Sequence, residues 1–520
     1  MKKVGRRSFL QLALLSSCGL ATAQTVWDGT TTPFTVENGQ ADIYTAEELA
    51  WLSASVKAGN DYEGVTINLR RNILLNENVE AKVAAGNTAG LREWSPIGRG
   101  SINGAAACPF KGTFDGHGHV VSGVYINQTG YGYANYEGLF GLLESGTIRY
   151  MGVEDSYVCG CSRVAGLCAA STGTIEYCYN NGQVDRVSQI HDNYYHAGIC
   201  GYLTGGVVQY CYNTGSIAGQ YSTAGVANGY GSSNIRYCYG AGPIVAGGGG
   251  QYGCCYNGVL CFSDGDIITL HDLPVNQHTD IVKTTTEMKA GNLFGDNGAE
   301  WIYLENEYPL LWLLVKSNDG GDGYYYTTYY HSKVNLFVYD ETAVVYKATG
   351  KTSDGLLLKT IPGNVIPKGN AVVIRSKYPD VMLIASDQEA DFAENVLEGI
   401  DEPKSKAEVG DVYTLAKENG VIGFYKYKGT TLGGHKAYIP FTAFGSEEAL
   451  SLPFYIEDDM NPSSSEDGMT EEGAVPTEID RQERMISSTN NIFYTMQGVK
   501  IQRPTQKGIY IKNGKKVCLR

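Results

Sequence analysis

Cysteines recur in this chain at positions where they could bind a metal ion, form disulfides or fill an apolar core. Three of them stand at the same place in the stretches "EYCYN", "QYCYN" and "RYCYG", as Cys178, Cys211 and Cys238. No pair has the CxxC spacing of structural zinc sites, because only Cys159-Gly-Cys161 and the vicinal Cys254-Cys255 come close together in sequence. The spacing therefore predicts no zinc site.

The disulfide alternative depends on how the three stretches stack. In stacked parallel strands, Cys178, Cys211 and Cys238 would lie about 4.8 Å apart, within the range of a disulfide. In-register side chains point the same way, however, which strains the torsion of about 90° that the bond prefers. We therefore predict that these three residues, with Cys168 and Cys200, are small buried apolar residues in the thiol form.

Histidines and carboxylates are the next candidates for chemistry. His117 and His119 lie in "FDGHGHVVSG", where alternation places both on one face of a strand, and we interpret them as solvated turn residues. The chain has no HExxH motif, nucleophile elbow or phosphate loop. The acids of the repeats do not recur at matching positions: Glu154, Asp155, Glu176 and Asp185. The sequence thus indicates no catalytic, cofactor-binding or metal-binding residues and no cofactor.

Tyrosine is the best candidate for contact with a ligand, because its face stacks on sugar rings and its hydroxyl forms hydrogen bonds. Tyr177, Tyr210 and Tyr237 flank the recurring cysteines. The longest insertion between repeats carries "HDNYYH", and insertions in repeat proteins often form binding loops. From it we add four candidates for ligand contact: His191, Tyr194, Tyr195 and His196. Stacked tyrosines also stabilise β-structure without any ligand, and the sequence leaves that alternative open.

The elements that position these residues form a repeat. Glycines recur at spacings of 28, 32 and 27 residues, at Gly138, Gly166, Gly198 and Gly225. Each repeat holds about three short β-like runs, which is typical of one coil of a right-handed parallel β-helix. Stacked coils would align Ile148, Ile175, Val208 and Ile235 as an inward apolar ladder. Residues 44–59 carry a capping box at Thr45 and Glu48 and predict a helix that covers the first coil.

The remaining chain changes character twice. We predict a signal peptide over 1–23, the β-helix over 24–315 and a linker over 316–323. Longer alternating strands then predict an antiparallel β-sandwich-like domain, an acidic disordered linker and a small basic β-hairpin tail. These three segments are 324–456, 457–490 and 491–520. The tail would serve in sorting or add a hairpin to the edge of the 324–456 sheet.

Composition limits the function further. The net charge of −15 and pI near 5.1 argue against nucleic acid as a partner. The N-terminus, "MKKVGRRSFLQLALLSSCGLATAQ", is an export signal with a cleavage site after Ala23, although lipidation at Cys18 is an alternative. No stretch reaches the ~18 continuous apolar residues of a membrane helix. We expect an exported protein at the outer surface or outside the cell.

Several stretches resemble surface proteins of Gram-negative anaerobes that carry GLUG-motif repeats. They include "WSPIGRG…PFKGTFDGHGHVVSGVYIN", "GLCAASTGTIEYCYNNGQV" and "GICGYLTGGVVQYCYNTGSI", and their order matches across about 40–315. The chain departs from the family where Tyr177, Tyr210 and Tyr237 replace the usual Asn. The final 30 residues resemble short C-terminal tails in which a sorting role is suspected, so that a secretion machinery would be their partner.

The resemblance implies adhesion or surface display. Together with the residues above, it predicts a non-enzymatic protein that binds a glycan or a host surface or matrix protein. The alternative is a β-helical carbohydrate-active enzyme, a polysaccharide lyase or glycoside hydrolase, because such enzymes place acid pairs or Ca²⁺-binding carboxylates on adjacent coils.

Overall fold

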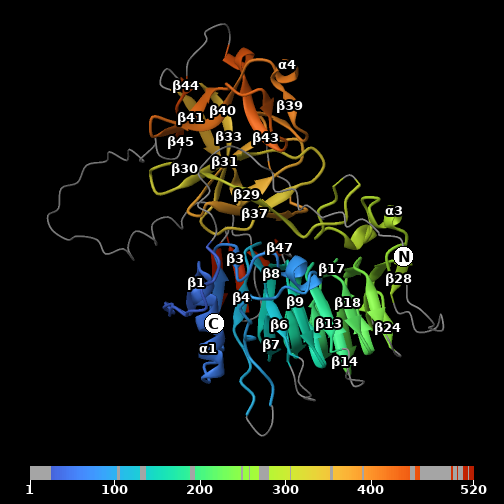
Figure 1. Ribbon diagram of the computed structural model, residues 1–520. Helices are drawn as coiled ribbons and strands as arrows, with labels where there is room; N and C mark the ends of the chain where they lie inside the picture. Colours follow the sequence, from blue (N-terminus) through green and yellow to red (C-terminus); the bar gives the residue numbers. More distant parts are fainter. Residues whose placement is uncertain are drawn as a thin grey trace, which may run out of the picture.

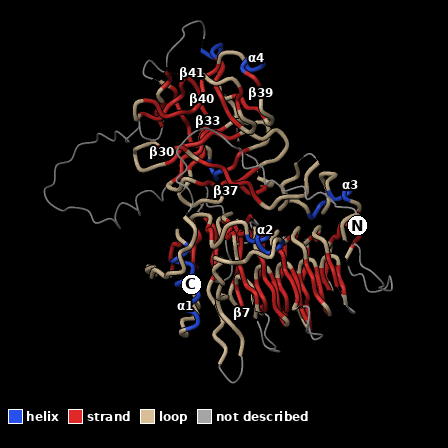
Figure 2. The backbone as a smooth tube through the Cα atoms, viewed as in Figure 1, coloured by secondary structure: helices blue, strands red, loops and turns tan. Residues whose placement is uncertain are grey.

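The structure is a computed structural model dominated by β-strands. It describes residues 25–101, 106–128, 136–187, 194–246, 250–256, 258–268, 280–304, 306–351, 355–388, 390, 392–444 and 451–456, and the backbone of 493–495, 500–501, 508–512 and 515–519. Strands make up 46% and helices 9% of it, so the predicted all-β class is confirmed. Figure 2 shows the strands in two groups, a stacked array below and a second group above it. The predicted signal peptide, Cys18 and the 457–490 linker lie outside the described residues.

The array consists of four sheets whose strands pair in parallel, and the chain visits these sheets in turn, one circuit after another (Figure 1). The largest sheet contains β1 (Gln40–Ile43), β2 (Thr66–Leu69), β3 (Ile73–Leu74), β4 (Thr113–Asp115), β5 (Val120–Ser122), β8 (Thr147–Glu154), β12 (Thr174–Asn180), β16 (Val207–Gln209), β17 (Tyr212–Asn213), β21 (Asn234–Arg236), β22 (Tyr239–Gly240), β26 (Gly258–Val259), β27 (Phe262–Asp264) and β28 (Ile281–Lys283). The second contains β7 (Phe140–Leu143), β11 (Cys168–Ser171), β15 (Cys200–Thr204), β20 (Ala227–Tyr230) and β25 (Cys255–Tyr256). The third contains β6 (Tyr125–Asn127), β9 (Tyr157–Gly160), β13 (Gln183–Arg186), β18 (Ile217–Gly219) and β23 (Ile244–Ala246), and the fourth contains β10 (Ser162–Ala165), β14 (Tyr194–Ala197), β19 (Tyr221–Ala224) and β24 (Gln251–Tyr252).

The predicted apolar ladder is confirmed by the strand register. Ile175 pairs with Ile148 on one side and Val208 on the other, and Val208 pairs with Ile235. All four side chains are buried in one core that runs through the array. The register therefore persists although the repeats differ in length, because each circuit places a β-branched apolar residue above its predecessor.

The cysteine ladder is confirmed in the same way. Cys168 pairs in register with Cys200, and both side chains are fully buried. Cys178 and Cys211 are buried as well, and burial raises the pKa of the Cys211 thiol. These residues fill the core as small apolar side chains.

We expect the ladder thiols to be free but inaccessible. Denatured, unreduced protein should titrate with most of its thiols reactive, whereas the folded protein should react slowly, because a buried, protonated thiol is a poor nucleophile. Thiol titration with a chromogenic disulfide reagent, with and without denaturant, makes the comparison. A Cys178–Cys211 or Cys211–Cys238 disulfide found by peptide mapping would contradict the ladder.

The predicted N-terminal helix is α1 (Ala46–Lys57). Thr45 and Glu48 form the reciprocal hydrogen bonds of a capping box, as the sequence indicates. Leu49, Leu52 and Val56 are fully buried and belong to the same core as the ladder residues. A short helix, α2 (Val79–Ala84), was not predicted. It begins at Asn78, and its first two backbone N–H groups donate to the Asp155 carboxylate.

The second group of strands pairs in antiparallel fashion, except that β34 and β45 are parallel. One sheet contains β29 (Trp312–Lys316), β37 (Asp380–Ala385), β32 (Leu336–Val338) and β35 (Val365–Ile366). The next contains β30 (Asn318–Asp319), β31 (Tyr325–Tyr329), β36 (Val372–Ser376), β33 (Val344–Lys351), β34 (Leu356–Thr360) and β45 (Phe454–Ile456). The others contain β38 (Glu398–Ile400), β43 (Lys436–Pro440), β40 (Val412–Glu418), β41 (Val421–Lys426) and β44 (Ser451–Leu452), and the pair β39 (Lys404–Ser405) and β42 (Thr431–Leu432). Short helices are α3 (Thr285–Met288), α4 (Lys406–Val409) and the 3₁₀ turns Gly295–Asn297, Pro362–Asn364 and Phe441–Phe444.

Two boundaries differ from the prediction. The first antiparallel strand begins at Trp312, and the expected linker 316–323 contains the end of β29 and all of β30. Its Gly and Asp residues form the turn between β30 and β31 instead of a flexible linker.

The basic tail forms a sheet of its own with β46 (Phe493–Thr495), β47 (Lys500–Ile501), β48 (Gly508–Lys512) and β49 (Lys515–Leu519). None of these four described strands pairs with the 324–456 sheets.

Candidate functional site

A hydrogen-bonded polar ladder runs along the largest parallel sheet. Its members stack in register, and acids alternate with groups that neutralise or bind them. In stacking order they are Asp42, Asn68, Asp115, Arg149, Glu176, Gln209 and Arg236. The Arg149 guanidinium donates to Asp115 at 2.8 Å, Gln209 donates to Glu176 at 2.7 Å, and Arg236 donates to Gln209 at 2.8 Å.

The ladder places no acid directly beside another acid. Glu176 lies between Arg149 and Gln209, and Asp115 between Asn68 and Arg149. The carboxylates of Asp115 and Glu176 are each held in place by a hydrogen bond from a ladder neighbour. Hydrolysis of a glycosidic bond needs two acids facing a shared substrate, and this ladder does not supply that pair.

A tyrosine ladder lies next to the polar ladder, and its backbone is left-handed. Tyr150, Tyr177, Tyr210 and Tyr237 have φ between 50° and 55°. Their ring centroids are 4.7, 5.0 and 5.0 Å apart in sequence order. Left-handed backbone disfavours a bulky side chain and is tolerated better by Asn, the residue that the GLUG pattern has there. Stacking of the rings offsets this strain.

Part of this ladder is covered by other residues. The Tyr339 ring lies 4.5 Å from that of Tyr150, and the Tyr177 hydroxyl donates to Glu300 at 3.2 Å. Burial raises the pKa of Tyr210 to about 12. The predicted contact residues Tyr177, Tyr210 and Tyr237 are half-buried and pack against the cluster that joins the two groups of strands. Their first role in the structure is therefore packing.

A second aromatic ladder, which we did not predict, forms the centre of that junction. Tyr179, Tyr212 and Tyr239 stack at 5.0 and 4.9 Å, and Trp312 and Trp301 lie against them. The signal was present in the recurring "YCY": alternation along a strand sends both tyrosines to the outer face and the cysteine to the core.

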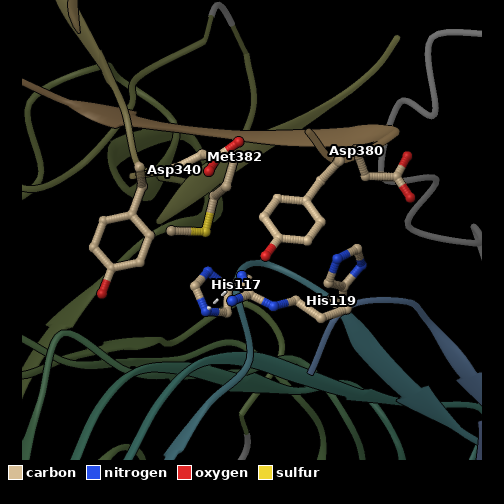
Figure 3. A pocket seen from close by; sticks show the side chains of 8 residues that line it. His117, His119, Asp340, Asp380 and Met382 are labelled. Atoms are coloured by element: carbon tan, nitrogen blue, oxygen red, sulfur yellow. Dashed lines mark hydrogen bonds between the residues drawn. The ribbon is translucent and has the colours of Figure 1, made fainter. Parts of the chain in front are cut away.

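A small cavity lies between the two groups of strands. Its lining residues come from a turn of the array and from the antiparallel strands above: Arg70, His117, His119, Tyr339, Asp340, Tyr378, Asp380 and Met382. Figure 3 shows Met382 pointing from the upper strand toward His117. The cavity volume is about 10 Å³, which is room for about one water molecule. A sugar ring does not fit in it.

The cavity corrects our interpretation of His117 and His119 as solvated turn residues. His119 is only 3% exposed, and burial lowers its pKa to about 3. Its Nδ1 lies 3.2 Å from the Asn72 side-chain oxygen, so the neutral ring donates from Nδ1. His117 has φ 47° and contacts Asn68 and Arg70 through Nε2, at 3.0 and 3.3 Å. The turn is buried because β29 and β37 cover it, and no local sequence signal reports that contact.

A cluster of half-buried tyrosines lies on another part of the array. We call it the tyrosine patch; it consists of Tyr194, Tyr195, Tyr202, Tyr221, Tyr230, Tyr252 and Tyr256. The residues come from β14, β15, β19, β20, β24 and β25. In Figure 1, β14 and β24 lie at the end of the circuits away from β29 and β37. The patch is therefore separate from the junction.

Ring contacts connect the patch. Tyr195 lies 4.7 Å from Tyr202 and 5.3 Å from Tyr230, and the Arg163 guanidinium lies 5.0 Å from the Tyr202 ring. The Tyr230 hydroxyl is 2.9 Å from that of Ser222. Adjacent rings thus present both aromatic surface and hydroxyl groups.

The structure divides the four residues that we predicted from the insertion. Tyr194 and Tyr195 belong to the patch, and His191 lies outside the described residues. His196 is fully buried, its Nε2 lies 3.3 Å from the Gly160 carbonyl oxygen, and burial lowers its pKa to about 4. We missed five tyrosines of the patch: Tyr202 lies on the next strand of the same circuit, and the other four come from later circuits, among them Tyr221, which pairs directly with Tyr194.

Comparison of the chain with protein-family models, with curated proteins and with solved structures found no match. In the described part of the chain, no helix has the length and apolar character needed to cross a membrane.

Proposed function

We propose that the protein is an exported, non-enzymatic binding protein and that the tyrosine patch is its ligand-binding surface. The observation that carries the proposal is the patch itself: seven half-buried tyrosines gathered from successive circuits, away from the junction. Tyrosine supplies a large apolar face and a polar tip at a low cost in side-chain entropy, which suits a binding surface.

The chemistry of the patch favours a neutral glycan. Sugar rings present C–H faces that stack on aromatic rings and hydroxyls that exchange hydrogen bonds with tyrosine. The chain carries a net charge of −15, which repels sulfated or otherwise polyanionic polysaccharides at a distance. A host surface or matrix protein is the other partner class that the GLUG resemblance implies.

The enzyme alternative has weaker support. Glu176 and Asp115 each lie between nonacidic neighbours in the polar ladder. The cavity that brings Asp340 and Asp380 together with two histidines holds about one water. A polysaccharide lyase or glycoside hydrolase needs an open groove with converging acids, and the described surfaces favour binding over turnover.

The architecture and the cellular location belong to the same proposal. We infer that the four parallel sheets wind as a right-handed parallel β-helix of the GLUG type, because successive circuits visit them in a fixed order. Residues 1–23 would direct export and be removed in the mature protein, which would act at the outer surface or outside the cell. The separate sheet formed by the 491–520 tail supports the proposal that the tail is a sorting element bound by a secretion machinery.

Two assays on the purified chain test the proposal together. We expect binding to a subset of neutral glycans on an array that also carries matrix proteins. We expect no release of reducing or unsaturated sugar ends from the bound glycans, with or without Ca²⁺. Measurable turnover would overturn the non-enzymatic part, and binding to matrix proteins alone would overturn the glycan part.

A further inference from the structure

Four buried cysteines converge where the core of the array ends. Cys254, Cys255 and Cys261 place their sulfur atoms within 4.8 Å of one another. Cys238, from the preceding circuit, stands at the position that matches Cys261, because Tyr239 pairs in register with Phe262. All four side chains are at most 1% exposed. We call these residues the thiol cluster.

The thiol cluster differs from the cysteine ladder elsewhere in the array. Cys168 and Cys200 supply one sulfur per circuit on adjacent strands. In the last circuit, by contrast, three sulfurs come from a stretch of eight residues and meet at one point. These three sulfurs lie within 4.8 Å of one another, close enough for one ion to contact all of them. Packing alone needs one small apolar residue at each ladder position, so this convergence calls for another explanation.

Gly258 makes room for the cluster. A Cβ atom at residue 258 would lie 2.1 Å from the Cys255 sulfur and 2.7 Å from the Cys261 sulfur. These distances are far below van der Waals contact, so only glycine allows both sulfurs to approach this strand. Gly258 is in β26 and has no positive φ, which leaves close approach as the reason for glycine here.

We propose that Cys254, Cys255 and Cys261, with Cys238 as the fourth sulfur, bind one thiophilic d¹⁰ metal ion, Zn²⁺ or Cu⁺. Four thiolates suit the tetrahedral coordination of Zn²⁺, and three or two suit Cu⁺. Each thiol that binds gives its proton to solvent, and no oxidation or reduction occurs. The spacing argument against zinc fails because it considers only neighbours in sequence, whereas the fold brings in a separate circuit.

The metal would hold the end of the array. The last strands are short, with two residues each in β24, β25 and β26, and Val259 is 59% exposed. Terminal units of stacked repeats lack a neighbour on one side and need added stabilisation. A bond from Cys238 to the three sulfurs of the next circuit would fasten the last circuit to the one before it.

The test uses the full chain, reduced and freed of metal by a chelator, and titrated with Co²⁺, Zn²⁺ or Cu⁺. We expect about one ion per chain, with thiolate-to-cobalt charge-transfer absorption for Co²⁺, and a higher Tm with the ion that binds. Elemental analysis separates the Zn²⁺ and Cu⁺ arms. Cys255→Ser should weaken binding at least about tenfold, which is the cost of losing even an outer-shell partner. Cys168→Ser, an equally buried thiol outside the cluster, should bind as wild type does.

The wild-type titration needs no variant, so a folding defect in Cys255→Ser leaves the proposal testable. Folded wild-type protein that binds none of the three ions would overturn it. So would equal loss of binding in Cys168→Ser, or a disulfide among Cys254, Cys255 and Cys261 in the protein as isolated. Alkylation of the free thiols in denaturant without a reductant, followed by peptide mapping, detects that disulfide.

Discussion

Trp312→Ala should lower the free energy of unfolding by about 3–5 kcal/mol, the range for truncating a large buried aromatic residue. Trp312 is 4% exposed and begins the first antiparallel strand. Its indole N–H donates to the Gly118 carbonyl at 3.0 Å, and its ring lies 5.6 Å from that of Tyr179. The variant therefore loses packing in both groups of strands and leaves a buried carbonyl without its donor. Urea denaturation followed by circular dichroism measures the loss.

Trp51→Ala is the matched control. Trp51 is half-buried on α1, where alanine favours the helix, so we expect a loss of about 1 kcal/mol. Equal losses in the two variants would mean that the array and the antiparallel strands do not share the core described here. We also expect Trp312→Ala to separate the unfolding of the two groups into two transitions, because their main shared core is weakened.

Acid should destabilise the protein strongly through His119. Its pKa is about 3 in the fold and about 6.5 in an unfolded chain. Between these values the unfolded chain binds a proton that the native protein excludes, so stability falls as the pH drops from about 6.5 toward 3 and is fully present above 6.5. At about 1.4 kcal/mol per pH unit, the loss is on the order of 4 kcal/mol near pH 3.

The groups around His119 disfavour proton uptake by the native state, with one exception. Burial is the largest cause, and His117, Arg70 and Lys316 add positive charge that disfavours a second cation. Asp380 is the exception, since burial raises the pKa of its carboxyl and favours proton uptake by the native state.

His119→Gln isolates the contribution, because the glutamine amide can still donate to Asn72 but does not titrate. We expect the free energy of unfolding of wild type to fall between about pH 7 and about pH 4 by roughly 3 kcal/mol more than that of the variant. His196, buried elsewhere, titrates in both proteins and cancels in the comparison. Identical pH dependence in the two proteins would show that His119 has the same pKa in the folded and unfolded chain, which would contradict this account.

The repeat itself could be predicted because the spacing of residues within each repeat determines the register of the strands. Ile148, Ile175 and Val208 stand 10, 9 and 10 residues after the recurring glycines, so stacking them requires no long-range information. The polar ladder has the same geometry but escaped notice, because Asp115, Arg149 and Glu176 differ in type. A ladder of identical residue types can be recognised in the sequence, whereas a ladder of different residues with complementary hydrogen-bonding groups cannot.

The candidate sites, unlike the repeat, depend on contacts between segments that are far apart in the sequence. The junction joins Gly118 to Trp312, and neither residue carries a local sign of the other. The thiol cluster joins Cys238 to a circuit with a different spacing, so a search for zinc motifs passes over it. The insertion did point to Tyr194 and Tyr195, but His196, on the same strand, turns into the core.

The central proposal is tested most directly by measuring affinity for a glycan that binds on the glycan array. The measurement compares variants in the tyrosine patch with a variant in the tyrosine ladder. Calorimetric titration of the double variant Tyr195→Ala and Tyr230→Ala should show at least about tenfold weaker binding than wild type, as expected for loss of two aromatic contacts. Tyr210→Ala, from the ladder, should keep wild-type affinity, with folding of each variant verified by its Tm. Unchanged binding in the double variant, or loss of binding in Tyr210→Ala alone, would contradict the assignment of ligand binding to the patch.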